Sequence, residues 1–114
     1  MGKIGEIDFN GESGKEYLFH IYEWETNFAA EEISRRCVYL VTRRHQVEGG
    51  VRFGQTVLYV GETEDLYRGL GDHEKTACFT ENGANCYCIH FDDDDQARKA
   101  KVKDLVKALN PVCQ

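Results

Sequence analysis

The sequence has no long hydrophobic run, no internal repeat and no low-complexity segment beyond Asp92–Asp95. No stretch approaches the roughly 20 apolar residues that a helix needs to cross a bilayer, so we expect no membrane partner. The first residues, Met1–Glu6, are polar and acidic, and they lack the apolar stretch of a secretory signal. These absences lead us to expect a soluble, cytoplasmic protein.

The chain is also too short for two independent hydrophobic cores. Its 114 residues, 41% of them hydrophobic and 11% aromatic, are enough for one globular domain. The same composition argues against wholesale disorder. We therefore expect a single domain that spans residues 1–114.

The five cysteines are an odd number, and no secretory signal accompanies them. We therefore expect reduced thiols rather than a disulfide framework. Cys86, Cys88 and His90 alternate on one strand face, which suggests zinc as one interpretation. Their spacing differs from the Cys-x₂-Cys of a zinc knuckle, and buried free thiols are common in cores. Core packing is the interpretation we prefer.

The chain lacks a positive net charge and stands at −6, which argues against indiscriminate nucleic-acid binding. The average conceals a pattern, because residues 35–60 hold five arginines and one glutamate, and residues 98–114 hold five basic residues and one acidic residue. Folding can bring these segments into one basic surface, or they can simply be solvated. The candidate nucleic-acid-binding side chains are Arg43, Arg44, Arg52 and Arg68.

Hydrophobic patterning predicts an α+β fold. Alternation and compact apolar runs predict strands at residues 15–24, 37–42, 56–60 and 85–91. Helical spacing predicts helices at residues 64–75 and 94–109, and polar or glycine-containing stretches predict loops at residues 43–54 and 76–84. We expect a small antiparallel sheet of three core strands, with an extra N-terminal strand and two main helices flanking it.

Three parts of the chain stand in an order and spacing that together suggest a family. They are Cys37-Val38-Tyr39, then Tyr59-Val60-Gly61 with Leu66 and His73 after it, and finally Leu105-Val106 followed by Pro111. In these parts the sequence resembles the GIY-YIG nuclease superfamily. The resemblance covers residues 36–114 as a GIY-YIG-like core and leaves residues 1–35 as an N-terminal extension.

The resemblance implies roles for four residues. The family hydrolyses phosphodiesters with one divalent metal ion. Tyr39 would position or deprotonate the attacking water, and Tyr59 would line the same pocket. Gly61 would let the backbone turn tightly into a helix, and His73 matches a histidine that the family often carries on that helix. A simpler interpretation of Tyr39 and Tyr59 is that both rings fill a face of the sheet.

Two other positions depart from the family pattern. Gly69 stands where the family places the arginine that holds the scissile phosphate, and Val102 stands where it places the glutamate that binds the metal. Because a metal ion and an arginine stabilise the charge that builds up during cleavage, we expect that cleavage is lost and that no cofactor is bound. The resemblance then implies a module that acts by binding a protein or DNA.

The alternative that the sequence leaves open is an endonuclease with a rearranged site. It would depend on Mg²⁺ or Mn²⁺ and would use Tyr39, Tyr59 and His73, with Glu62 as the metal ligand. Such a site would need its ligands held within narrow distance limits.

Overall fold

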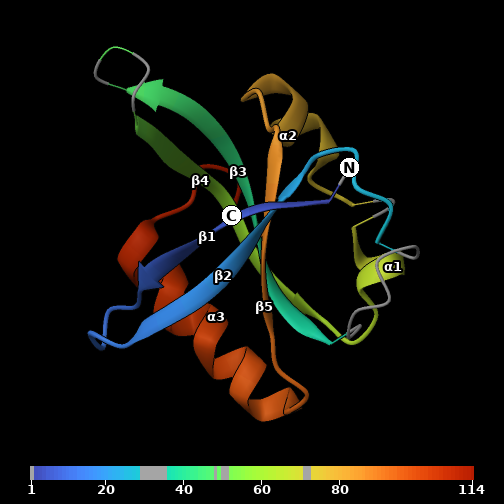
Figure 1. The fold of residues 1–114 in the computed structure, drawn as a ribbon. Helices are drawn as coiled ribbons and strands as arrows, with labels where there is room; N and C mark the ends of the chain where they lie inside the picture. Colours follow the sequence, from blue (N-terminus) through green and yellow to red (C-terminus); the bar gives the residue numbers. More distant parts are fainter. Residues whose placement is uncertain (1, 29–35, 48, 50–51, 71–72) are drawn as a thin grey trace.

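One antiparallel sheet of five strands organises the chain in the computed structural model, which describes residues 2–28, 36–47, 49, 52–70 and 73–114. The strand order is β1-β2-β5-β3-β4, and the three helices of the described residues flank the sheet (Figure 1). The elements are β1 (Lys3–Asn10), β2 (Glu16–Glu23), β3 (Cys37–Val47), β4 (Arg52–Thr63), α1 (Leu66–Gly69), α2 (Thr76–Glu81), β5 (Cys86–Phe91) and α3 (Asp95–Leu109). The fold is α+β, as the hydrophobic pattern predicts.

The N-terminal extension contributes two strands to the sheet and not one. β1 pairs with β2 as an antiparallel hairpin in which Phe9 faces Tyr17, and β2 pairs with β5 with Ile21 facing Cys88. β1 was not predicted because it is an edge strand. Only its alternate residues, such as Ile7 and Phe9, are half-buried, so its hydrophobic signal is weak.

The loop predicted at residues 43–54 is wrong, because β3 and β4 continue through it as a two-stranded hairpin. Arg44 pairs with Gln55, and Val47 pairs with Arg52 beside a turn that contains Gly49 at a φ of 77°. The outer half of this hairpin projects past the other strands (Figure 1). It contacts little of the core, so its residues show no apolar alternation that a sequence pattern could detect.

The helix predicted at residues 64–75 is much shorter in the structure. α1 ends at Gly69, and α2 occupies part of the loop that was predicted at residues 76–84. A glycine in a helix interior costs about 1 kcal/mol relative to alanine, which explains why α1 ends there. His73 therefore lies before α2 and not on a continuous helix with Leu66.

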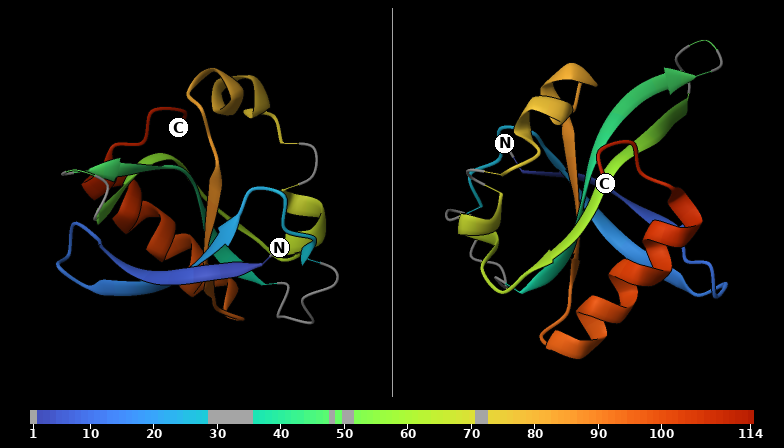
Figure 2. Two further views of the ribbon diagram at one scale, coloured as in Figure 1. Left: turned by 45° about the horizontal axis from the view of Figure 1, so that its top comes forward. Right: turned by 180° about the vertical axis from the view of Figure 1, so that it is seen from behind.

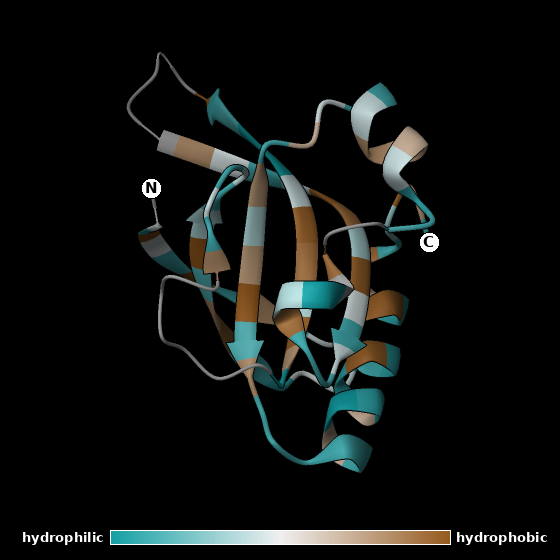
Figure 3. Cartoon of the chain, turned by 90° about the vertical axis from the view of Figure 1, so that its right-hand side faces the viewer, coloured by the Kyte–Doolittle hydropathy of each residue, from teal (hydrophilic) through white to brown (hydrophobic). Residues whose placement is uncertain are grey.

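The two faces of the sheet bury two separate hydrophobic clusters. α3 covers one face, where Phe19, Leu40, Cys88 and Leu105 pack together, and α1 and α2 lie toward the other side (Figure 2). Hydrophobic residues gather in the strands and in the C-terminal half of α3, whereas the first turns of α3 are hydrophilic (Figure 3). No helix in the described part of the chain is both long and apolar enough to cross a membrane.

The predicted faces of β5 and α3 are confirmed. Cys86 and Cys88 point toward α3 and Ile89 points toward the other cluster. The predicted apolar stripe of α3 packs on the sheet, and its members are Val102, Leu105, Val106 and Leu109.

The expectation of reduced thiols is wrong for one pair of cysteines. Cys78 of α2 and Cys113 of the C-terminal tail form a disulfide across a sequence separation of 35 residues. Cys37, Cys86 and Cys88 are free and buried. Cysteine count and spacing do not reveal which side chains the fold brings together, and this pair meets only because the tail returns to α2.

Candidate functional site

Tyr39, Tyr59 and His73 lie together on the face of the sheet opposite α3. The Tyr39 hydroxyl and Nε2 of His73 are 2.9 Å apart. The Tyr59 ring lies 4.7 Å from the His73 ring and 6.0 Å from the Tyr39 ring, measured between centroids. The three side chains that the resemblance singled out are therefore one contact group, although they come from β3, β4 and the segment before α2.

Gly61 makes this approach possible. It faces Tyr39 across the β3–β4 pair, and a Cβ at this position would lie 2.6 Å from the Tyr39 hydroxyl and 2.8 Å from Cε2 of Tyr59. The expectation that Gly61 turns the chain into a helix is wrong, because β4 continues to Thr63. The glycine instead leaves room for the two phenol rings above it.

The hydrogen bonds of His73 decide where its proton lies. The backbone amide of Lys75 donates to Nδ1 over 3.0 Å, so Nδ1 is an acceptor. A neutral imidazole with an acceptor Nδ1 carries its proton on Nε2, which therefore donates to the Tyr39 hydroxyl. In this arrangement His73 has no free lone pair with which to take a proton from Tyr39.

Burial keeps all three groups uncharged. It is the largest influence that raises the pKa of Tyr39 and that of Tyr59 above their ordinary values. It likewise lowers the pKa of His73 below its ordinary value, with the nearby Lys75 ammonium adding to this and Glu74 opposing it. At neutral pH the cluster consists of two protonated phenols and a neutral imidazole.

A cavity of about 230 Å³ lies beside His73. Its lining includes the rings of Trp24, Phe79 and Tyr87. The described residues that line this space are thus mainly aromatic, and none of them brings a charged group to the phenols.

Glu62, the candidate metal ligand, lies on the other face of the sheet. Its Oε1 accepts a hydrogen bond from Nε of Arg98 at 2.9 Å, and it borders a groove with α3 residues that include Lys99 and Val102. Strand alternation explains the separation, because the side chain of Glu62 points away from that of its neighbour Gly61 and from the phenols. The structure does not bring Glu62 and His73 to one point.

Val102 also lies away from the two tyrosines. It packs in the cluster beneath α3, against residues such as Val60 and Leu105. A side chain at this position points into the α3-side core and not toward Tyr39.

The residues that the structure describes do not fit the single metal ion that the resemblance implies. Among the described residues, no three His, Cys, Asp or Glu side chains are grouped so that they could hold an ion. At the other candidate cluster, Nδ1 of His90 donates to the Leu18 carbonyl and Nε2 accepts from Lys101. Burial raises the pKa of the Cys88 thiol to about 12, which disfavours the thiolate that zinc requires.

The basic candidates fall into two places. Arg43 and Arg44 lie on the β3–β4 hairpin, where the Arg44 guanidinium sits 3.8 Å from the centre of the exposed Phe53 ring. Arg52 begins β4 on the same hairpin, and its side chain lies outside the described residues. Arg68 is on α1, well away from the hairpin, beside a group of acidic residues that includes Glu62 and Glu64.

The sequence analysis does not single out two residues that are important in the structure, Phe79 and Arg98. Phe79 of α2 packs its ring 5.0 Å from His73 and 5.8 Å from Tyr59, and the sequence does not mark it because its pattern predicts a loop at residues 76–84. Arg98 is 1% exposed. It stands four residues before Val102 and seven before Leu105, so the apolar stripe of α3 already placed it on the buried side.

Comparison of the chain with protein-family models, with curated proteins and with solved structures gives no match.

Proposed function

We propose that this chain is a GIY-YIG-like module that binds DNA through the β3–β4 hairpin and does not cleave it. The observation that carries the proposal is that the outer half of the hairpin projects past the other strands and holds basic side chains and an exposed aromatic ring. The overall acidity of the sequence favours a protein as the ligand and puts a nucleic acid second. The hairpin favours the nucleic acid.

The geometry of the hairpin suits a phosphate backbone. Arg43 and Arg44 are successive residues of β3, so their side chains point to opposite faces of the two-stranded ribbon. The Phe53 ring packs against the Arg44 guanidinium in a cation–π contact. A two-stranded ribbon is narrow enough to enter the major groove of DNA, where arginines on both faces can reach the flanking phosphates.

The chemistry of the phenol–imidazole cluster supports binding without cleavage. A general base must accept a proton from the attacking water or from a group that activates it. His73 donates through Nε2 and accepts at Nδ1 from the backbone, and both phenols keep their protons at neutral pH. Among the described residues, the charged groups that act on these three side chains are Glu62, Glu74 and Lys75, and none of these is an arginine that could hold a scissile phosphate.

Fluorescence anisotropy with a labelled DNA duplex tests the binding half of the proposal. We expect binding that weakens steeply as salt rises, because phosphate contacts release counterions. Arg43→Ala should weaken binding and reduce the salt dependence by about one unit of log–log slope. Arg68→Ala is the matched control, since it removes one exposed arginine from α1 and should leave the affinity nearly unchanged.

Two results would contradict the proposal that the β3–β4 hairpin binds DNA. Equal loss of affinity in the Arg43 and Arg68 variants would mean that only net charge matters. Absence of DNA binding at low salt would remove DNA as the ligand and would leave a protein partner as the ligand of the module.

Incubation of the protein with a supercoiled plasmid and Mg²⁺ or Mn²⁺ tests the second part of the proposal, that the module does not cleave DNA. We expect no nicking above the background of the buffer. Nicking that Tyr39→Phe abolishes would show that the phenol cluster is catalytic, and it would establish the metal-dependent endonuclease in place of the binding module.

A further inference from the structure

The C-terminal tail wraps around the free edge of β4. α3 ends at Leu109, Asn110 adopts a left-handed conformation at a φ of 47°, and Pro111 and Cys113 are buried. Cys113 belongs to the hydrophobic cluster on the side of α1 and α2, whereas α3 packs on the opposite face. The tail therefore passes from one face of the sheet to the other at β4, the edge strand (Figure 2).

Hydrogen bonds tie the tail to β4 as an added strand would. The Cys113 amide donates to the Leu58 carbonyl over 2.7 Å. The Gln114 side chain accepts from the Val60 amide at 2.9 Å and donates to the Val60 carbonyl at 2.8 Å. Backbone groups of an edge strand that would otherwise face water or another chain are thus occupied by the tail.

The disulfide is the covalent anchor of this tail. Cys113 is joined to Cys78 of α2, and the Asn82 side chain donates to the Cys78 carbonyl at 2.8 Å. α2 has only six residues, no side-chain hydrogen bond at its N-cap, and Phe79 as its buried residue. So short a helix is marginal without tertiary contacts, and its position depends on the disulfide and on Phe79.

The position of α2 in turn fixes His73. The His73 carbonyl accepts from Oγ1 of Thr76 at 2.6 Å, and Nδ1 accepts from the Lys75 amide. Phe79 packs its ring against the imidazole. A movement of α2 therefore moves His73 relative to the Tyr39 hydroxyl.

We propose that the Cys78–Cys113 disulfide is a redox-sensitive latch that couples the C-terminal tail to the Tyr39–His73 contact. A dithiol reductant transfers two electrons and two protons, so that the S–S bond breaks, two thiols form and the reductant becomes a disulfide. The tail then leaves β4, α2 loses its covalent anchor, and His73 separates from Tyr39. This inference goes beyond the proposed function, because it concerns the tail and holds for any ligand of the hairpin.

The three other cysteines do not take part in the reaction. Cys37, Cys86 and Cys88 are free and buried in the sheet, so reduction changes the covalent state of one pair only. Thiol titration of the denatured chain should give three thiols before reduction and five after it, which establishes the state of each sample.

Amide hydrogen exchange, followed by NMR, tests the latch. On reduction with dithiothreitol we expect the Cys113 and Val60 amides to exchange about tenfold faster or more, because release of the tail breaks the hydrogen bond from Cys113 to the Leu58 carbonyl and that from Val60 to the Gln114 side chain. Amides of β5, between β2 and β3 in the centre of the sheet, should keep their exchange rates. The imidazole signals of His73 should shift in the same sample.

Variants separate the latch from general destabilisation. Cys78→Ser should reproduce the reduced state without reductant. Gln114→Ala keeps the disulfide and should speed exchange at Val60 while the signals of His73 stay in place. The latch is wrong if Cys113 and Val60 exchange equally in both redox states, if β5 amides accelerate as much as Cys113 does, or if the oxidised chain titrates as five thiols.

Discussion

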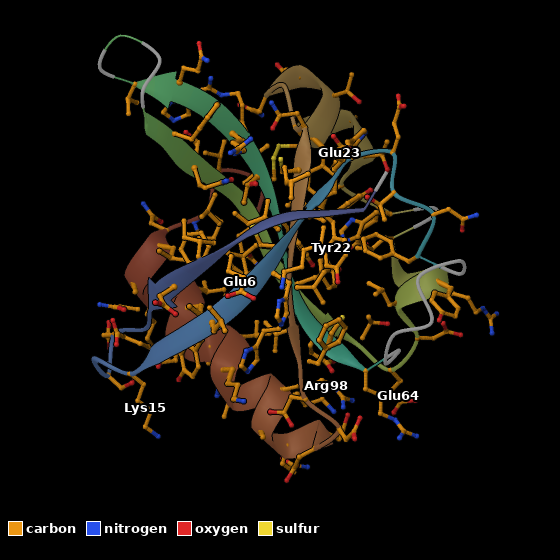
Figure 4. The ribbon with its side chains drawn as sticks, viewed as in Figure 1. Glu6, Lys15, Tyr22, Glu23, Glu64 and Arg98 are labelled. Carbon is orange, nitrogen blue, oxygen red and sulfur yellow. A yellow bond between two sulfur atoms is a disulfide. The ribbon has the colours of Figure 1, made fainter. Side chains whose placement is uncertain are left out.

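Arg98 of α3 donates from Nε to Oε1 of Glu62 on β4 over 2.9 Å, and this ion pair joins the start of the long helix to the edge of the sheet. The guanidinium also donates to Oδ1 of Asp95 at 2.8 Å and to the Asp92 carbonyl at 3.1 Å. Arg98 lies near the start of α3, close to the connection from β5 (Figure 4). All three of its nitrogens are bonded, which is what a buried guanidinium requires.

Replacing Arg98 by alanine should destabilise the fold. The change removes a buried side chain and leaves Glu62 without its cation, and we expect the free energy of unfolding to fall by about 2–4 kcal/mol. Urea denaturation measures this. Lys99→Ala is the matched control, because Lys99 pairs with Asp95 at an exposed position and such pairs contribute little. Equal losses in the two variants would contradict the structural role of Arg98.

Gly61→Ala should disturb the phenol cluster directly. The new methyl group would lie 2.6 Å from the Tyr39 hydroxyl, so the ring must move, and overpacking of this kind costs about 1–3 kcal/mol. Urea denaturation measures the loss, and the His73 imidazole signals in an NMR spectrum should shift with it. Gly5→Ala is the control, since its Cβ would meet Ile21 at an ordinary 3.6 Å, and it should change neither quantity. A stable Gly61→Ala variant with unshifted His73 would show that the phenols do not approach β4 as closely as described.

Asp104 should matter for the N-terminal hairpin although it lies on α3. Its carboxylate accepts from the Ser13 amide, the Ser13 hydroxyl and the Tyr17 hydroxyl. These bonds hold the pKa of Asp104 below its ordinary value, with the side-chain bond from Ser13 the largest cause. The stability that they contribute is therefore present above the unfolded pKa of about 4 and is lost as the pH falls through the lowered folded value.

Asp104→Asn is the corresponding variant. The amide accepts more weakly than a carboxylate does, so the Ser13 amide should exchange faster with solvent at neutral pH. The same variant should lose less stability than the parent protein on acidification. An unchanged exchange rate at Ser13 would mean that the hairpin is held by its strand pairing alone.

The sequence predicts well the elements whose hydrophobic pattern runs along their whole length and whose ends carry a stop signal. β5 alternates strictly between its two faces, and α3 combines an apolar stripe with the stop signal of Asn110-Pro111. Local hydrophobic patterning records burial. β5 lies between the two hydrophobic clusters, and α3 packs its apolar stripe on the sheet. The sequence does not predict β1 or the outer half of β3, because few of their residues are buried. Their apolar alternation is therefore too weak to indicate a strand.

The candidate site was predictable only in part, for a different reason. The grouping of Tyr39, Tyr59 and His73 followed from the resemblance, whereas Phe79 and the disulfide partner Cys113 reach the site from segments that no local pattern connects to it. The side of the sheet on which Glu62 lies depends on a single residue of register in β4. The spacing of Glu62 and His73 in the sequence is compatible with a shared site. Strand alternation in β4 instead turns the Glu62 side chain to the other face of the sheet, where it contacts Arg98.

The last prediction concerns pH. Burial lowers the pKa of His90, and the Lys101 ammonium that donates to its Nε2 also lowers it, while the Leu18 carbonyl opposes this. In the unfolded chain an imidazole takes its proton near pH 6.5, so between that value and the lower folded value the unfolded state binds more protons. The free energy of unfolding should therefore fall as the pH drops below about 6.5, by at most about 1.4 kcal/mol per pH unit for this one group. Urea denaturation across that range measures the slope. His90→Gln, which can still donate to Leu18 and accept from Lys101, should have a shallower slope than the parent protein, and an identical slope would show that His90 is not a source of the acid sensitivity.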